Sequence, residues 1–202
     1  APFGSQQLAI THLGPDASQC SMGRHDHGGC NDRPSQRAAS GFVDTGDMIA
    51  KSTVRLAPDE TGGSLFDKLS AEGARLCVET MKMIEDGTAE YTPQNSEEAT
   101  HTSMISKELG FIDWTKPAVE IERLIRGLNP WPSAYTHLNG KTFKVWSAKV
   151  IDGSDDYEPG CIYHIGKNDM YVQTGKGALS LVEVQLQGKK RMDTGSFLRG
   201  CH

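Results

Sequence analysis

Residues 134–151 read AYTHLNGKTFKVWSAKVI, and this stretch decides the fold of the C-terminal half of the chain. Two runs with period-two alternation, 134–138 and 141–151, flank the dipeptide Asn139-Gly140. A two-residue type I′ turn needs positive φ at both positions, which Asn and Gly accept most readily. The stretch therefore predicts a β-hairpin.

Further strand patterns follow this hairpin. Residues 161–165 and 170–174 surround a turn at Gly166–Asp169, and "ALSLVEVQL" at 178–186 gives a fifth strand. A short helix is expected from Thr194. Five short strands with close turns predict a small OB-like β-barrel, an architecture that many oligonucleotide binders use.

A helix precedes the hairpin. Thr115 is its expected N-cap, Pro117 lies in its first turn, and apolar residues recur between 119 and 128. Gly127 and the "NPWP" of residues 129–132 should end it, because a residue before proline avoids the helical region.

The first half of the chain contains one expected strand and one expected helix. Residues 48–56 ("MIAKSTVRL") read as a strand, and residues 64–86 carry apolar positions at helical spacing. Ser64 is the expected N-cap and Gly87 the expected left-handed stop.

Polar, aperiodic sequence at 88–106 reads as a linker, and residues 1–41 read mostly as loop. The predicted fold class is an α/β portion, made of a strand and a helix, joined by a linker to a small OB-like β-barrel with a preceding helix. The expected domains are 1–42 (unassigned), 43–87, 88–106 (linker) and 107–202.

Composition argues against a membrane-spanning protein and against a disulfide-rich one. Apolar residues make up 37% of the 202 residues and charged residues 23%, and no apolar run reaches the length of a membrane helix. The five cysteines are odd in number and scattered, which favours a reducing compartment over a disulfide framework. We expect a cytoplasmic protein with no membrane contact.

The net charge of −5 is distributed unevenly, with −7 on residues 1–106 and +2 on residues 107–202. On a regular strand Lys144 and Lys149, an odd number apart, would face opposite sides. Trp114, Trp131 and Trp146 could stack on bases, but we expect them to be core residues. The candidate phosphate-binding residues are Arg123, Arg126, Lys141, Lys144, Lys189, Lys190 and Arg191.

Residues 43–48 read "VDTGDM" and offer two carboxylates. One of them could serve as a general acid or base if a His and an amide lay within reach. Alternatively, the segment is a turn held by Asx hydrogen bonds.

In order along the chain stand "VDTGDM", "DETGGSLFDKL", "GFIDW", "LIRGLNPWPSAYT", "GKTFKVW", "GKGALSLVEVQLQGKKRM" and "FLRG". This series resembles the methionyl-tRNA formyltransferase family from residue 43 to about 200. The resemblance implies a Rossmann-like catalytic domain, a linker and an OB-like domain with basic, tRNA-binding surface. It implies formyl transfer from 10-formyltetrahydrofolate to the amino group of methionyl initiator tRNA in translation initiation, with Asp44 as the catalytic Asp and Asp47 in a structural or peripheral role.

The chain departs from the family upstream of Asp44. The family's catalytic Asn and His come from an N-x-H-x-S-L-L-P segment, and His12, His25 and His27 each lack an Asn two residues earlier. The formyl-folate loop is also missing from the sequence. We therefore expect a fragment with doubtful activity of its own, monomeric and without an obligate protein partner. Two alternatives stay open: a non-catalytic tRNA- or RNA-binding module, and a formyltransferase acting on a sugar-nucleotide amine.

Residues 1–42 allow two further hypotheses. Cys20, His25, His27 and Cys30 could ligate zinc, although their spacing matches no common zinc pattern and we expect no metal. The segment could also reflect a frame or gene-model error, because the codons for residues 23–28, read one nucleotide later, can encode Gly-Val-Thr-Ile-Met.

Overall fold

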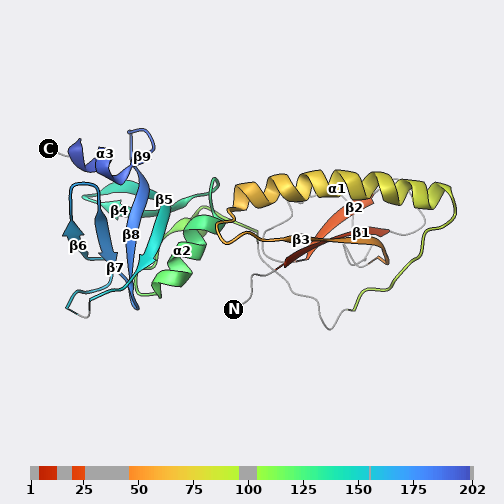
Figure 1. Ribbon diagram of the computed structural model, residues 1–202, viewed down its shortest axis with the longest axis horizontal. Helices are drawn as coiled ribbons and strands as arrows, with labels where there is room; N and C mark the ends of the chain where they lie inside the picture. The colour runs from red at the N-terminus through yellow and green to blue at the C-terminus, as the bar shows by residue number, and fades with distance from the viewer. Residues whose placement is uncertain (1–4, 13–19, 26–45, 96–103, 155, 201–202) are drawn as a thin grey trace. The chain divides into compact units, whose positions relative to one another are not determined.

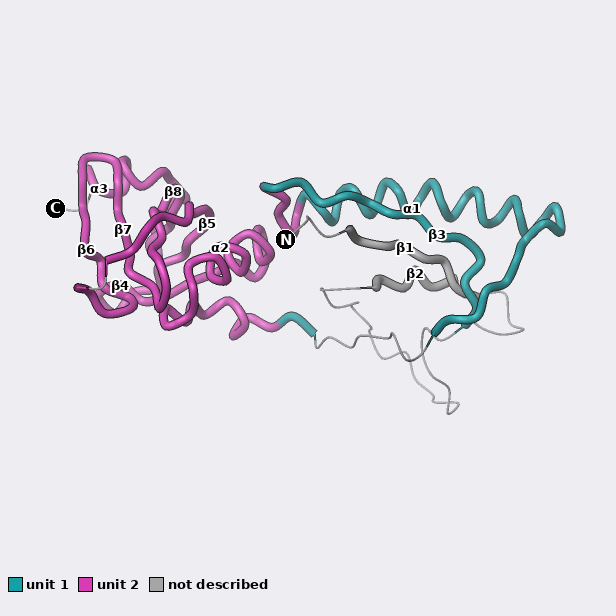
Figure 2. The backbone as a smooth tube through the Cα atoms, turned by 60° about the horizontal axis from the view of Figure 1, so that its bottom comes forward, with its two compact units in different colours: residues 1–58, 64–105 teal, residues 59–63, 106–202 magenta. Residues whose placement is uncertain are grey.

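The computed structural model describes residues 5–12, 20–25, 46–95, 104–154 and 156–200, the first two ranges as backbone only. The chain divides into two compact units (Figure 2). Unit 1 comprises residues 1–58 and 64–105, and unit 2 comprises residues 59–63 and 106–202.

Unit 1 contains a three-stranded antiparallel sheet and a long helix (Figure 1). The strands β1 (Ser5–His12), β2 (Cys20–His25) and β3 (Met48–Arg55) are ordered β2-β1-β3. β3 confirms the predicted strand, but β1 and β2 lie where we expected loop. β1 pairs with β3, which lies far along the chain, and β2 pairs with β1; pairing of this kind outweighs weak local propensity.

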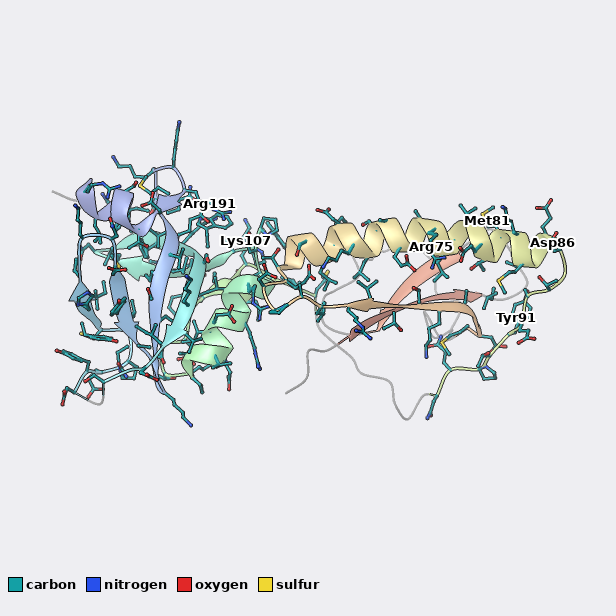
Figure 3. All side chains as sticks on the ribbon, in the orientation of Figure 1. Arg75, Met81, Asp86, Tyr91, Lys107 and Arg191 are labelled. Atoms are coloured by element: carbon teal, nitrogen blue, oxygen red, sulfur yellow. The ribbon has the colours of Figure 1, made fainter. Side chains whose placement is uncertain are left out.

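Helix α1 (Gly62–Glu85) confirms the long predicted helix. It begins two residues before Ser64, so Ser64 is not its N-cap. Gly87 has φ of +68° and ends the helix as predicted. Leu69 and Leu76 of its apolar stripe are buried, whereas Met81 (Figure 3) is 64% exposed.

Side-chain contacts join α1 to β3. Leu76 packs against Ala50, and the Ser52 hydroxyl donates a hydrogen bond to the Glu72 carboxylate. Hydrogen bonds from Arg75 and Ser52 lower the pKa of the Glu72 carboxyl to about 2. Part of the expected linker also belongs to this unit, because Met48 and Thr92 exchange backbone hydrogen bonds of 2.8 and 2.9 Å.

Unit 2 is an antiparallel sheet with two helices. The sheet order is β4-β5-β8-β7-β6, with β9 paired to β8. The elements are the 3-10 helix η2 (Glu108–Gly110), α2 (Ala118–Gly127), β4 (Ala134–Leu138), β5 (Lys141–Ile151), β6 (Ile162–Ile165), β7 (Met170–Gln173), β8 (Ala178–Leu186), β9 (Met192–Asp193) and α3 (Thr194–Arg199).

The predicted hairpin is confirmed as β4–β5. Asn139 and Gly140 have φ of 49° and 75°, the positive values that a type I′ turn requires. β6, β7 and β8 lie within one residue of their predicted bounds, and β9 is an added short strand.

The predicted OB-like closure is not found. Within the described strands the sheet is open, because β4 and β6 at its two ends do not pair. Phe111 bridges Tyr135 on the free edge of β4, and the Ile112 amide donates to the Tyr135 carbonyl at 2.8 Å. That edge is therefore already occupied, and four-residue β6 offers a short edge on the other side.

The start of α2 differs from prediction. The Asp113 carboxylate accepts hydrogen bonds from the Thr115 amide at 3.0 Å and the Thr115 hydroxyl at 2.6 Å. Pro117, not Thr115, occupies the N-cap position, and no side chain caps the helix. Thr115 therefore belongs to an Asx-type turn before the helix.

One apolar core holds unit 2 together, and α2 and α3 contribute to it. Trp114 packs partly buried against this core, as expected, whereas Trp131 is 59% exposed and is not a core residue. The fully enclosed members include Ile112, Ile121, Ile125, Val145, Leu179 and Val184.

Asp193 caps α3, and its removal should destabilise unit 2. Its carboxylate accepts hydrogen bonds from the Ser196 amide at 2.8 Å and hydroxyl at 2.7 Å, and the Ser196 hydroxyl lowers its pKa most. We expect Asp193→Ala to lower the unfolding temperature by a few degrees, and Glu158→Ala, an exposed acid elsewhere in the unit, to leave it unchanged. Because the pKa is depressed, the difference should persist at neutral pH and shrink on acidification. Thermal unfolding at pH 7 and pH 3 measures both effects, and equal shifts in the two variants would refute the cap.

Candidate nucleic-acid interface

A bulge in β5 brings Lys144 and Lys149 to the same face of the sheet. The pairing of β5 with β8 shifts register between Val145 and Ala148, so the side-chain alternation changes phase there. Val145 before the bulge is buried, and Ala148 after it packs against the same core. The expectation that Lys144 and Lys149 face opposite sides is therefore wrong. We call the face of the sheet turned away from the core the outer face.

Trp146 lies on this outer face at the centre of a charged cluster. The Arg191 guanidinium lies 4.6 Å from the Trp146 ring centroid, and the Lys144 ammonium lies 5.5 Å from it. Both positions are within cation–π range. The Trp146 indole N–H donates to the Gln185 side-chain oxygen at 3.1 Å, which orients the ring. Trp146 is therefore a half-buried platform, not the core residue that we expected.

Glu183 completes what we call the Trp146 cluster, which comprises Lys144, Trp146, Glu183 and Arg191. The Arg191 Nε donates to the Glu183 carboxylate at 2.6 Å, and a second guanidinium nitrogen donates to its other oxygen. This hydrogen bonding raises the pKa of Arg191. This two-point pair restrains the guanidinium above Trp146, while the Arg191 side chain stays 40% exposed.

Two more lysines lie in the turn between β8 and β9. Lys189 and Lys190 are exposed, and the Gln185 side-chain amide donates to the Lys189 carbonyl at 2.9 Å. Gln185 therefore binds both Trp146 and this turn. Figure 3 shows Arg191 at the same hairpin.

Lys141 lies beside that turn, at the start of β5. Its neighbour Thr142 accepts a backbone hydrogen bond from Gln187 at 2.8 Å and donates to the Gln187 side chain at 3.0 Å. Five of the predicted residues therefore gather at one end of the β5–β8–β9 region: Lys141, Lys144, Lys189, Lys190 and Arg191.

Arg123 and Arg126 lie apart from this group, on α2. The Arg126 side chain pairs with Glu122 at 2.8 Å and donates to the Glu60 carbonyl at 2.8 Å. These contacts anchor residues 59–63 to unit 2, a structural role that the sequence did not indicate. Arg123 is exposed.

Arg126 and Arg123 form a matched pair for a stability test. We expect Arg126→Ala to lower the free energy of unfolding by about 1–2 kcal/mol, because it removes charged hydrogen bonds to Glu122 and Glu60. Arg123→Ala, which removes the same group from the exposed side, should change it by less than about 0.5 kcal/mol. Urea denaturation measures both, and the reverse order would contradict the anchoring role.

Several predicted residues lie outside the described residues. Asp44 is among them, as are His27 and Cys30 of the hypothetical zinc site, and only the backbone of Cys20 and His25 is described. Asp47 is exposed just before β3. In the described part of the chain no group of three or more His, Cys, Asp or Glu side chains could hold a metal ion, and no helix there has the length and apolarity to cross a membrane.

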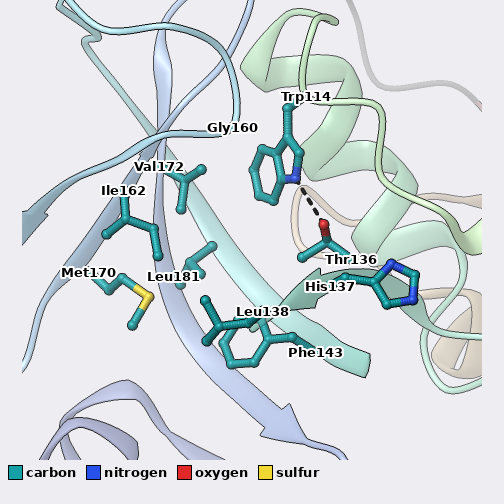
Figure 4. Close-up of a pocket in the computed structure, with 10 residues that line it drawn as sticks. All are labelled: Trp114, Thr136, His137, Leu138, Phe143, Gly160, Ile162, Met170, Val172 and Leu181. Atoms are coloured by element: carbon teal, nitrogen blue, oxygen red, sulfur yellow. Dashed lines mark hydrogen bonds between the residues drawn. The ribbon is translucent and has the colours of Figure 1, made fainter. Parts of the chain in front are cut away.

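A small pocket with a cavity volume of about 60 Å³ lies inside unit 2 (Figure 4). The Trp114 indole N–H donates to the Thr136 hydroxyl at 3.2 Å in its wall. No carboxylate, amide side chain, Lys or Arg lines it, and its polar side-chain groups are those of Trp114, Thr136 and His137. Its lining is Trp114, Thr136, His137, Leu138, Phe143, Gly160, Ile162, Met170, Val172 and Leu181.

Sequence reasoning missed Glu183 and Gln185, which orient Arg191 and Trp146. The alternation of "EVQL" at 183–186 contained the signal, since it places Glu183 and Gln185 on the side opposite Val184 and Leu186. Only the observed register shows that these polar residues meet Lys144 and Trp146.

Comparison with known proteins identifies relatives. A family model described as "Formyl transferase, C-terminal domain" matches residues 104–202. The chain is 99% identical over 160 residues to the methionyl-tRNA formyltransferase of Agathobacter rectalis, covering 79% of this chain and 52% of the relative. It is 48% identical over 163 residues to that of Lachnospira eligens, covering 78% and 52%. The chain thus spans about half the length of the curated relatives it matches.

Solved structures with a similar fold include HypX from Aquifex aeolicus in complex with tetrahydrofolic acid. Its TM-score is 0.56 at 19% identity, covering 81% of this chain and 29% of HypX. The N-formyltransferase from Helicobacter canadensis, in complex with folinic acid and dTDP-3-aminofucose, gives 0.52 at 17% identity, covering 69% and 51%. These likenesses concern the fold alone.

Proposed function

We propose that the chain is the C-terminal part of a methionyl-tRNA formyltransferase. Two findings support this: residues 104–202 match the C-terminal domain of formyl transferases, and 160 residues are 99% identical to a methionyl-tRNA formyltransferase. In this proposal residues 107–202 bind initiator methionyl-tRNA, and residues 43–87 end the catalytic domain. The formyl donor is 10-formyltetrahydrofolate. We further propose that the protein is a cytoplasmic monomer.

The Trp146 cluster and its flanking lysines are the observation that carries the tRNA-binding part of the proposal. Lys141, Lys144, Lys189, Lys190 and Arg191 gather at one end of a sheet in a chain whose net charge is −5. Phosphate contacts of this kind position RNA without reading its sequence. A guanidinium held over an indole and still partly exposed also stays available to a phosphate.

Catalysis in this proposal needs groups from the rest of the enzyme. Formyl transfer to an amine passes through a tetrahedral oxyanion, which an amide and an imidazole stabilise. Asp44 would hold the imidazole or a bridging water and assist removal of the amine proton. The Asn and His of the family motif are not in these 202 residues, and we assign no described residue to the folate donor.

A non-catalytic RNA-binding module is the second candidate, favoured by the missing Asn and His. A sugar-nucleotide formyltransferase is the third candidate. The solved N-formyltransferase from Helicobacter canadensis, which is similar in fold to this chain, is in complex with dTDP-3-aminofucose. The 99% identity to a methionyl-tRNA formyltransferase favours the first reading over the third.

Equilibrium binding of fluorescently labelled initiator methionyl-tRNA to the whole chain tests the proposal. We expect saturable binding at 50 mM salt that weakens steeply as salt rises. A dTDP-amino sugar should not compete. Binding of the sugar nucleotide but not of tRNA would support the third candidate and overturn ours.

A further inference from the structure

Three aromatic side chains form a partly exposed group at the β4 edge of the sheet. Phe111 is 50% exposed, and its ring centroid lies 5.7 Å from that of Tyr135 and 5.9 Å from that of His137. The Tyr135 and His137 rings are 6.1 Å apart. We call Phe111, Tyr135 and His137 the Phe111 group.

The sheet register makes the Phe111 group continuous with the Trp146 cluster. Phe111 bridges Tyr135, Tyr135 pairs with Lys144, and Lys144 pairs with Gln185. Residues directly opposite each other on neighbouring strands share a face. The aromatic rings therefore lie on the same outer face as Trp146 and Arg191, one strand away from them.

The core does not require these rings. The neighbours Ile112 and Thr136 fill the inner side, where Ile112 is 1% exposed and Thr136 lines the internal pocket. Phe111 could be polar without leaving a cavity there. Packing within unit 2 therefore does not explain why the apolar ring of Phe111 is half exposed near lysines.

The charge around the Phe111 group favours an anionic partner. Lys141 and Lys144 lie on the adjacent strand β5, and Lys107 precedes η2 (Figure 3). Two carboxylates, Glu108 and Asp113, oppose these three lysines, and hydrogen bonds lower the pKa of both. The five groups together therefore carry one net positive charge. Aromatic faces next to cations are the combination that binds unpaired nucleotides, with bases stacked on rings and phosphates on cations.

We propose that the Phe111 group stacks against an unpaired base of the RNA whose phosphates the Trp146 cluster and the β8–β9 turn contact. This proposal rests on the proposed function and adds to it a preference for single-stranded nucleotides next to a duplex. The occupant is thus an RNA segment with a splayed base, not a uniform duplex.

Two synthetic hairpin RNAs with equal numbers of phosphates test the proposal on the whole chain. One carries a single-stranded 3′ extension containing 2-aminopurine, and the other is blunt with a longer stem. Stacking on an aromatic ring quenches 2-aminopurine fluorescence. We expect tighter binding of the extended hairpin, with quenching, and a loss of affinity for it of about 5- to 100-fold in Phe111→Leu. Phe111→Trp should retain both quenching and affinity.

Tyr91→Leu is the matched control, because Tyr91 is a 49% exposed aromatic residue of unit 1. Tyr91→Leu should bind both hairpin RNAs with the affinity of the wild-type chain. Thermal unfolding checks that Phe111→Leu folds, and His137→Leu provides a second variant of the same group with the same expected loss.

The outcomes separate this proposal from the function on which it rests. Salt-dependent binding of both hairpins, unchanged by Phe111→Leu and without quenching, would overturn the stacking site and leave RNA binding intact. Equal weakening on both hairpins would reduce Phe111 to a structural role and also overturn it. Binding of neither hairpin, or ring-dependent self-association of the chain in place of RNA binding, would overturn both proposals.

Discussion

The 202-residue chain by itself is expected to transfer no formyl group from 10-formyltetrahydrofolate to methionyl-tRNA above the uncatalysed rate. Its resemblance to the methionyl-tRNA formyltransferases assigns the oxyanion donor and the imidazole to an N-x-H-x-S-L-L-P segment that these residues lack. Loss of an oxyanion donor costs about 10²–10³ in kcat, and loss of general acid–base catalysis about 10²–10⁴. Together they should lower the rate at least about 10⁴-fold, and because the formyl-folate loop is also missing from the sequence, nothing holds the donor for the remaining reaction.

Formylated methionyl-tRNA, separated from unreacted methionyl-tRNA and counted with a radiolabelled formyl donor, measures this rate. Asp44→Asn is the control, because a background reaction does not depend on that carboxylate. Turnover by the wild-type chain that Asp44→Asn abolishes would show that this polypeptide assembles a catalytic site without the family's Asn and His.

Replacing Lys189, Lys190 and Arg191 together by alanine is expected to weaken tRNA binding by about 10- to 500-fold at 0.1 M salt. Each phosphate contact that is lost removes a factor of up to about eight at this concentration, because fewer counterions are released on binding. Glu183 partly neutralises Arg191, so we expect a loss of tRNA affinity smaller than the roughly 500-fold that three full phosphate contacts would give. The salt dependence should become shallower at the same time.

A charge-matched variant separates local contacts from net charge. Lys51, Arg55 and Lys82 are exposed in unit 1, and their joint replacement by alanine removes the same three charges. This unit 1 variant should lower tRNA affinity much less than the replacement of Lys189, Lys190 and Arg191 does. If the two triple variants lose equal affinity, the β8–β9 turn has no special role and the attraction is non-specific.

Local signals in the sequence predicted the parts of the fold that short-range chemistry determines. Asn139-Gly140 defined the hairpin because both residues accept positive φ, and Gly87 ended α1 for the same reason. The alternation in residues 178–186 gave β8 with the observed bounds.

Features that depend on distant partners escaped prediction. Phe111 and Ile112 contact the edge of β4 at Tyr135, more than 20 residues further along the chain, and β4 does not pair with β6 in the described sheet. β1 and β2 depend on pairing with each other and with β3. The β5 bulge places Lys144 and Lys149 on one face where opposite faces were expected, because it inserts a phase change that composition does not reveal.

The candidate site was predicted in its charges but not in its architecture. "GKKR" indicated a basic turn, yet Glu183, Gln185 and Trp146, which orient Arg191, emerged only from the register of β5 against β8. Arg126 looked like a phosphate contact and instead pairs with Glu122 and Glu60. The role of Asp44 stays a prediction from the resemblance.

The dependence of tRNA affinity on salt tests the central claim, that the cations around Trp146 bind RNA phosphates, most directly. Five cations, one of them partly neutralised, predict a slope of about −3 to −4 for the logarithm of the association constant against the logarithm of salt concentration. We expect this slope for the wild-type chain and a slope smaller in magnitude by about 2–3 for the triple variant of the β8–β9 turn. A wild-type slope near zero, or the same slope in both proteins, would contradict the claim.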